Sequence, residues 1–383
     1  MPTNDVSDKL LAPDEDHTYM YLNRDRLSKS EQMPTHSADD ETPSQLLNSE
    51  STSNHFDRSF GSSTSNHKAT STTVRNKDKS DVKEAEQTGD RQQITEDRLV
   101  IGNQTLFDES EFISTLVHLS RKIAEQYGFV TLQFLNRGYL NLTKSWACNV
   151  KCMEVLPRVL FLATDQDAMD GLSRLNIEIQ SLLLPFETGF KLYFGQIRYY
   201  RFVLLRTWLV VVLLQRNIPV TVIESDAVWF DDALPFISKC QGFDIVSTSN
   251  SLGEGGISTG FIYINTTASG KRVWLNMFRE FGAYMETQVN GSAMMTGPNS
   301  EMVTLRRVIH KDHVKVKTLP LKNFVSGLWY KNATLREITK PIVIQNNYIV
   351  GVDAKIGRAQ TWGHWYLTND GQCKDNRELV KCI

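Results

Sequence analysis

Residues 219–230 read PVTVIESDAVWF, an apolar run that contains two acidic side chains, Glu224 and Asp226, one residue apart. An apolar run that ends in carboxylates predicts a buried strand delivering acidic groups to the edge of a sheet. Small ligands bind at that edge in open α/β folds. Two neighbouring carboxylates repel each other unless a proton or a cation intervenes, so the pair favours a divalent ion with oxygen ligands. The simpler alternative is a strand followed by an acidic, solvated turn, because Asp231 and Asp232 follow closely.

The composition divides the 383-residue chain into two parts. Residues 1–97 are rich in Ser, Thr, Asp, Asn, Glu and Lys and contain no cysteine. Such a stretch cannot bury enough apolar surface to offset its chain entropy, so we expect a disordered, Ser/Thr-rich tail or stem. Recurrent apolar runs begin at Leu99, and every Trp and Cys follows it. Residues 98–383 are therefore predicted to form one large folded domain.

Charge and hydropathy argue against several partners. The net charge of −2 gives no electrostatic preference for nucleic acid or for an anionic membrane surface, so we expect neither. The longest apolar stretch, residues 208–214, is too short to span a bilayer. No signal peptide pattern is visible at the N-terminus.

Two other features favour the secretory pathway. Sequons for N-glycosylation occur at five positions, which are Asn103, Asn141, Asn265, Asn290 and Asn332. Cys373 and Cys382 flank a short polar segment, as a loop-closing disulfide would, while Cys148 and Cys152 have helical i, i+4 spacing. Cys240 would then be unpaired. The alternative is five reduced thiols in a cytosolic protein.

The apolar pattern along residues 98–383 predicts alternating helices and strands. We expect helices over residues 106–127, 140–153, 195–215, 272–286 and 299–310. Strands are expected over residues 128–134, 157–164, 219–230, 243–247, 257–264, 314–319, 325–330 and 341–350. Such alternation predicts an α/β fold with a mostly parallel sheet and a mixed C-terminal portion.

Five blocks, in order, resemble the nucleotide-diphospho-sugar transferase family of glycosyltransferases. They are TLQFLNRGYLNLTKSWACN (131–149), RVLFLATDQDAMDGL (158–172), IPVTVIESDAVWFDDALPFI (218–237) with FDIVSTSN (243–250), ISTGFIYINTT (257–267) and VIQNNYIVGVDAKIGRAQTWGHWYL (343–367). The resemblance implies a GT-A fold, a Rossmann-like α/β domain with a mostly parallel central sheet flanked by helices. It also implies a retaining transfer of a sugar from a UDP-sugar to a hydroxyl of a glycan or glycoprotein.

The resemblance assigns roles to matching positions. Glu224 and Asp226, with Ser225 between them, match the DxD motif, and a Mn²⁺ or Mg²⁺ cofactor is expected there. Positions for binding the nucleotide sugar are Thr131 and Gln133 near the base, Asp165 near the base or ribose, Thr259 and Gly260 near the sugar, Gly351 as a point of close chain approach, and Lys355 near the diphosphate.

Several positions depart from the family pattern. Glu224 is one methylene longer than the usual aspartate. Gln345 or Asn346 stands where a histidine commonly ligates the metal, so Gln345 is a further candidate ligand. The family's Asp-Gln pair is replaced near Asn299, and Glu301 is the candidate catalytic acid. His310 and His313 are expected on the surface.

Two function classes remain open at this stage. The first is an active, metal-dependent glycosyltransferase, with a Golgi location and a membrane anchor implied by the resemblance. These residues contain no anchor, so we expect an anchored form that begins upstream. The second is a non-catalytic module that binds a nucleotide sugar or a glycan. The departures from the family pattern at Glu224, Gln345 and Asn299 favour this second class. A dinucleotide-dependent oxidoreductase would need a GxGxxG motif after a strand, and the sequence has none.

Overall fold

The computed structural model describes residues 98–101, 104–186, 192, 196–249, 256–289 and 300–375. The tail predicted for residues 1–97 therefore lies outside the described residues, as do Asn103, Asn290 and Cys382.

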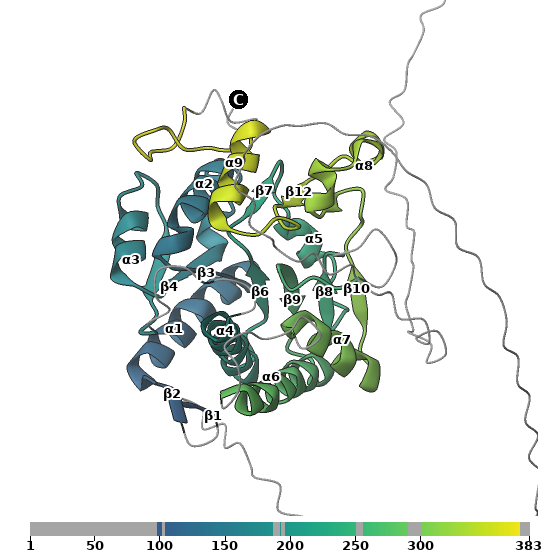
Figure 1. Cartoon of the computed structure of the whole chain (residues 1–383). Coiled ribbons are helices and arrows are strands. Elements are labelled where there is room, and N and C mark those ends of the chain that lie inside the picture. Colours follow the sequence, from purple (N-terminus) through teal and green to yellow (C-terminus); the bar gives the residue numbers. More distant parts are fainter. Residues whose placement is uncertain are drawn as a thin grey trace, which may run out of the picture. The chain divides into compact units, whose positions relative to one another are not determined.

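A seven-stranded sheet lies at the centre of the described domain (Figure 1), in the order β10-β8-β9-β6-β3-β4-β5. Its strands are β3 (Val130–Leu135), β4 (Val159–Ala163), β5 (Gln180–Leu183), β6 (Val220–Ile223), β8 (Ile245–Ser247), β9 (Phe261–Ile264) and β10 (Val316–Thr318). Within this sheet, only β9 runs antiparallel to its neighbours, β6 and β8. The predicted α/β fold with a mostly parallel sheet is confirmed.

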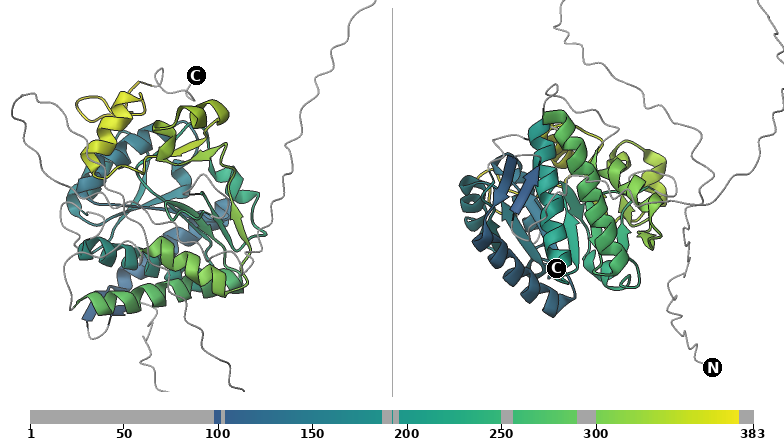
Figure 2. Two further views of the ribbon diagram at one scale, coloured as in Figure 1. Left: turned by 45° about the vertical axis from the view of Figure 1, so that its right-hand side comes forward. Right: turned by 90° about the horizontal axis from the view of Figure 1, so that it is seen from below.

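Helices cover both faces of the sheet, because its strands alternate apolar side chains between two hydrophobic clusters. In β4, Leu160 and Leu162 join one cluster, whereas Phe161 joins the other. The first cluster includes residues of α1 (Ser110–Tyr127), α4 (Ile197–Gln215), α6 (Ala268–Val289) and α7 (Glu301–Lys311). The second includes residues of α2 (Leu140–Val150), α3 (Gln166–Ser173) and α5 (Leu234–Ser238). Figure 2 shows α6 and α7, in green, along one face.

The stretch 219–230 forms two strands instead of the single strand expected. β6 ends at Ile223, and β7 (Ala227–Trp229) belongs to a separate three-stranded sheet. There β7 pairs antiparallel with β12 (Val343–Gln345), which pairs in parallel with β11 (Phe324–Val325). The polar residues 224–226 are the link, because the chain leaves the central sheet where its apolar run ends.

Other boundaries also shift. Residues 104–108 form β2 (Gln104–Asp108), which pairs with β1 (Arg98–Ile101), so the first helix starts at Ser110 and not at residue 106. The strand expected over 325–330 gives way to a 3₁₀ helix at Gly327–Tyr330. Two helices near the C-terminus, α8 (Ala333–Ile338) and α9 (Val352–Thr361), were not predicted, and β12 ends at Gln345, well short of residue 350.

The cysteine pairing differs from the one expected. Cys373 forms a disulfide with Cys148 of α2, with their Cα atoms 5.3 Å apart. The predicted bond between Cys373 and Cys382 is therefore wrong. Residue 373 pairs with Leu367 in an isolated bridge, which turns the C-terminal segment back toward α2. Cys240 is a free thiol, as predicted.

Among the described residues, none of the helices has the length and apolar character needed to cross a membrane.

Candidate functional site

A pocket opens at the carboxyl ends of β3 and β6, the sheet edge that the sequence predicted for ligand binding. The aromatic side chains that line it include Phe134, Tyr199 and Phe202. The polar side chains that line it come from distant parts of the chain, and they include Asn136, Tyr139, Arg206, Glu224, Asp226 and Lys355. The pocket therefore combines an apolar wall with a few convergent charges, as small-molecule sites usually do.

Asp226 and Lys355 form an ion pair in this pocket. Lys355 Nζ lies 2.5 Å from Asp226 Oδ2, and the two side chains are 17% and 4% exposed. Burial lowers the pKa of Lys355, but the carboxylates of Asp226 and Glu224 outweigh it and raise that pKa above its usual value. The lysine therefore stays charged next to the acid.

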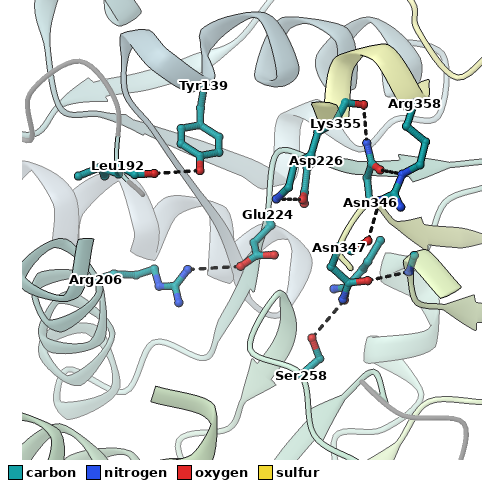
Figure 3. A network of polar contacts seen from close by, with 12 residues as sticks. Tyr139, Leu192, Arg206, Glu224, Asp226, Ser258, Asn346, Asn347, Lys355 and Arg358 are labelled. Carbon is teal, nitrogen blue, oxygen red and sulfur yellow. Dashed lines mark hydrogen bonds and ion pairs between the residues drawn. The ribbon is translucent and has the colours of Figure 1, made fainter. Parts of the chain in front are cut away.

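Asn346 forms hydrogen bonds to the main chain of both Asp226 and Lys355, and Figure 3 shows its side chain beside Lys355 and Arg358. Its N–H donates to the Asp226 carbonyl at 3.2 Å, and its side-chain amide donates to the Lys355 carbonyl at 2.9 Å. Arg358, nearly one turn after Lys355 in α9, donates to Asn346 Oδ1 at 2.6 Å. The relative position of Asp226 and Lys355 is thus fixed by the main chain as well as by their own contact.

Glu224 faces a second cation, Arg206 of α4 (Figure 3). Arg206 Nη1 lies 4.0 Å from Glu224 Oε1, and the guanidinium also donates to Glu301. Burial and the nearby Asp226 raise the pKa of Glu224, while Arg206 and Lys355 oppose that rise. The two side-chain cations therefore offset part of the mutual repulsion of the two acids, which the sequence predicted.

Glu301 binds Arg206 from behind the pocket. It is the first residue of α7, is 6% exposed, and accepts a hydrogen bond from Arg206. It is not among the residues that line the pocket. The structure therefore places this candidate catalytic acid where it can orient Arg206.

Gly260 lies directly against Glu224. The Glu224 N–H donates to the Gly260 carbonyl at 3.0 Å. A Cβ at Gly260 would lie 2.6 Å from Glu224 Oε2 and 2.9 Å from Gln345 Nε2, so a side chain there would displace both of them. The absence of a side chain at Gly260 leaves space for Glu224, which is one methylene longer than the aspartate usual in the family.

Ser225 and Gln345 complete the surroundings of the two acids. The buried Ser225 hydroxyl accepts a hydrogen bond from Thr143 of α2 at 2.9 Å. Gln345 Oε1 accepts a hydrogen bond from Ser258 at 3.1 Å, and its Nε2 has no partner among the described residues.

Other predicted site residues lie away from the pocket. Thr131 and Gln133 are fully buried inside β3, and their side-chain polar atoms have no hydrogen-bond partner in the described part of the chain. Asp165 caps α3 by accepting from the Ala168 N–H and also accepts from the Arg137 N–H. Gly351 has a φ of 91°, and no atom would lie within 4 Å of a Cβ there. It is needed for its left-handed conformation and not for a close approach.

Arg206 is the main pocket residue that the sequence reasoning missed. The signal was a single arginine inside the apolar run 203–214, since a buried arginine requires an anionic partner. Asn346 was noted only as a replacement for a histidine, and its role in joining two backbones was not foreseen. His310 and His313 are exposed, as predicted.

The oxygen atoms near Asp226 are poorly arranged for the expected divalent ion. The candidate ligands are Glu224, Asp226 and Gln345. Among their buried oxygen atoms, only Asp226 Oδ1 has no hydrogen-bond partner in the described part of the chain. Asp226 Oδ2 contacts an ammonium group, and the Gln345 carbonyl already accepts from Ser258. Within the described ranges, no group of three or more His, Cys, Asp or Glu side chains could hold a metal ion. Mn²⁺ or Mg²⁺ at a nucleotide site usually takes one or two carboxylates together with phosphates and waters. Here both carboxylates already face side-chain cations, Lys355 and Arg206, so the residues as arranged do not fit such an ion.

Comparison with known proteins identifies the class. The profile of the family described as nucleotide-diphospho-sugar transferase matches residues 154–358, more than half of the chain. The chain belongs to this family, as the five sequence blocks predicted, and it is a glycosyltransferase by family.

One curated relative is UDP-D-xylose:L-fucose alpha-1,3-D-xylosyltransferase 3 of Arabidopsis thaliana, 28% identical over 147 residues. The match spans 37% of this chain and 37% of that relative. Among solved structures, the apo form of mouse xyloside xylosyltransferase 1 is 9% identical, with a TM-score of 0.40 over 57% of this chain and 98% of that one. The galactosyltransferase LgtC, in complex with donor and acceptor sugar analogs, is 12% identical, with a TM-score of 0.37 over 57% and 86%.

Proposed function

We propose that this protein transfers a sugar from a UDP-sugar donor to a hydroxyl group of a glycan or glycoprotein, with retention of the anomeric configuration. Family membership supports a nucleotide-sugar donor, and the xylosyltransferase relative makes UDP-xylose the first donor to test. The observation that carries the proposal is the pocket at the ends of β3 and β6, where Lys355 and Arg206 place two cations beside two carboxylates.

The proposed roles follow from charge. As the bond to the sugar breaks, negative charge develops on the diphosphate, and preorganised cations in a water-poor site stabilise such charge. Lys355 is the cation we assign to the diphosphate. Arg206 is assigned to the donor sugar side of the pocket, where Glu301 holds its orientation. No residue is assigned as a nucleophile, because Glu301 is engaged by Arg206 and does not line the pocket.

The proposed location is the Golgi lumen, and the acceptor a glycan or glycoprotein found there. The disulfide between Cys148 and Cys373 supports an oxidising compartment, where such bonds form and persist. Exposed Asn141, in a glycosylation sequon, is accessible for modification there. Finding the protein in the cytosol with Asn141 unmodified would contradict this location.

The test is a donor panel with the full chain, measuring UDP release from UDP-xylose, UDP-arabinose, UDP-glucose and UDP-galactose, with and without added glycan acceptors. We expect Asp226→Asn to lower UDP release by about 100-fold or more, because it removes the charge that holds Lys355. Asp231→Asn, at an exposed neighbouring position, should leave it unchanged. The anomeric configuration of the product, determined by NMR, tests retention.

A second candidate is a non-catalytic module that binds a nucleotide sugar. The engagement of Glu301 away from the pocket favours it, because the pocket then lacks this acid as a catalytic group. Calorimetric binding of UDP-sugars without turnover of any donor or acceptor would select this candidate over the enzyme.

A further inference from the structure

We propose that Lys355 supplies, as a built-in side-chain cation, the positive charge that a divalent ion would otherwise place beside the donor diphosphate, so that donor binding needs no metal. The inference rests on the proposed UDP-sugar donor and departs from the Mn²⁺ or Mg²⁺ requirement that the family resemblance implies.

The first support is that the lysine is held in place by several contacts. Asn346 bonds to the main chain of both Asp226 and Lys355, so the two residues cannot separate without breaking these bonds. Arg358 anchors the same helix through Asn346 Oδ1 and through the Asn347 carbonyl, each at 2.6 Å. Its guanidinium also lies over the Tyr330 ring, 4.6 Å from the centroid. Helix α9 is therefore docked with its lysine directed at Asp226.

The second support is the pairing of the two acids. Asp226 is paired with Lys355, and Glu224 faces Arg206, which Glu224 shares with Glu301. The two acids following β6 therefore have cationic partners within the protein. A divalent ion on Asp226 would lie next to the Lys355 ammonium, and like charges at that distance in a buried site repel strongly.

The third support is the chemistry at Gln345, where the family commonly has a ligating histidine. Gln345 Nε2 and Glu224 Oε2 both lie within 3 Å of the point where a Gly260 side chain would begin. An amide N–H is a hydrogen-bond donor and cannot ligate a metal ion. This side of the site therefore presents an amide N–H, with no hydrogen-bond partner among the described residues, in place of a third ligand.

A lysine ammonium can perform the required step. It has three N–H donors, of which one meets Asp226, and the others can reach phosphate oxygens as a compact point charge. During transfer, the bond between the anomeric carbon and the diphosphate oxygen breaks, and its electron pair stays on that oxygen. The acceptor oxygen bonds to the carbon, and the acceptor proton passes to the released diphosphate. Lys355 stabilises the added charge on the leaving group without losing its own proton.

The deciding experiment is calorimetric titration of UDP into the full chain, in EDTA and then in MnCl₂. We expect the Kd to differ by less than about threefold between the two buffers. Binding that is more than about tenfold tighter with Mn²⁺, or that vanishes in EDTA, would overturn the inference and leave the proposed function standing. A failure to bind UDP in both buffers would overturn both.

The lysine itself is tested with Lys355→Met, which keeps the length of the side chain and removes its charge. In EDTA this variant should bind UDP at least about tenfold more weakly than the wild type. The matched control is Lys331→Met, at an exposed position outside the pocket, which should bind as the wild type does. Unchanged binding by Lys355→Met would refute the inference. If that variant does not fold, the comparison of buffers on the wild type decides alone.

Discussion

Gly260 lies beside Glu224, where one added carbon atom would disturb a residue of the pocket. Replacing it with alanine would put a Cβ 2.6 Å from Glu224 Oε2. The Glu224 side chain is 37% exposed and can swing away, but the buried Gln345, 2.9 Å from the new Cβ, must also shift, so we expect a loss of about 1–3 kcal/mol of stability. Catalytic geometry is far less tolerant, and UDP-sugar turnover should fall by about tenfold or more.

The control for this prediction is Gly242→Ala, where nothing would lie within 4 Å of the new Cβ. It should leave both turnover and melting temperature unchanged. Wild-type turnover by Gly260→Ala would show that the position of Glu224 is not important for the reaction.

His364 should make the stability of the fold depend on pH. Its ring packs against Phe230, with centroids 5.2 Å apart, and its Nδ1 lies 2.9 Å from the Tyr330 hydroxyl. Burial lowers its pKa from 6.5 to about 4. The unfolded chain therefore takes up a proton before the folded chain does, and stability falls as the pH drops through the window from 6.5 to about 4.

Urea unfolding midpoints across this window measure the effect. His364→Gln cannot titrate and should show a shallower decline than the wild type, while His310→Gln, at an exposed site, should keep the wild-type decline. Equal declines for all three proteins would mean that His364 is not the group responsible.

At this scale, the sequence located Glu224, Asp226 and Lys355 in one pocket but could not supply their partners. Spacing within a strand is local, whereas Arg206 arrives from a preceding helix and Asn346 from a distant loop. Thr131 and Gln133 illustrate the converse limit. The sequence pattern does not distinguish a polar strand residue that faces a ligand from one that faces the protein interior. Here the side chains of Thr131 and Gln133 are both buried.

At the scale of elements, α9 and the 3₁₀ helix at Gly327–Tyr330 offer two alanine substitutions with opposite expected effects on stability. Gly357 is exposed in the middle of α9 and has open space around it, so Gly357→Ala should raise the free energy of unfolding by about 0.5–1 kcal/mol. Gly327→Ala would place a Cβ 1.9 Å from the Asn347 carbonyl oxygen and should lower it by about 1–3 kcal/mol. Equilibrium denaturation of both variants checks the two signs together, and two shifts of the same sign would contradict the prediction.

The same elements show what sequence periodicity can predict. Six strands of the central sheet were predicted because each lies in a short apolar run of the sequence. The seventh, β5, was missed because its residues are only partly buried and half polar. Helix α9 was missed because only Ala359 of its residues is buried, so it has no apolar stripe to detect. The change of sheet within residues 219–230 was missed because β7 is as apolar as β6, and only its pairing with β12 separates them.

At the scale of the whole described domain, the disulfide between Cys148 and Cys373 joins residues 225 positions apart. Closing so long a loop restricts the unfolded chain, so replacing both residues with serine should cost about 2–5 kcal/mol of stability. Cys240→Ser removes the free thiol and should have little effect. Melting temperatures with and without a reducing agent check this. A wild-type melting temperature that does not respond to reduction would contradict the prediction.

The bond between Cys148 and Cys373 also affects how this protein must be produced. Bacterial cytoplasm keeps thiols reduced, so material made there would have α2 untethered from the chain's last described segment. Expression through a eukaryotic secretory host, or export to the periplasm, should yield the cross-linked form. Donor screens run on reduced material would risk scoring a misassembled sample as an inactive enzyme.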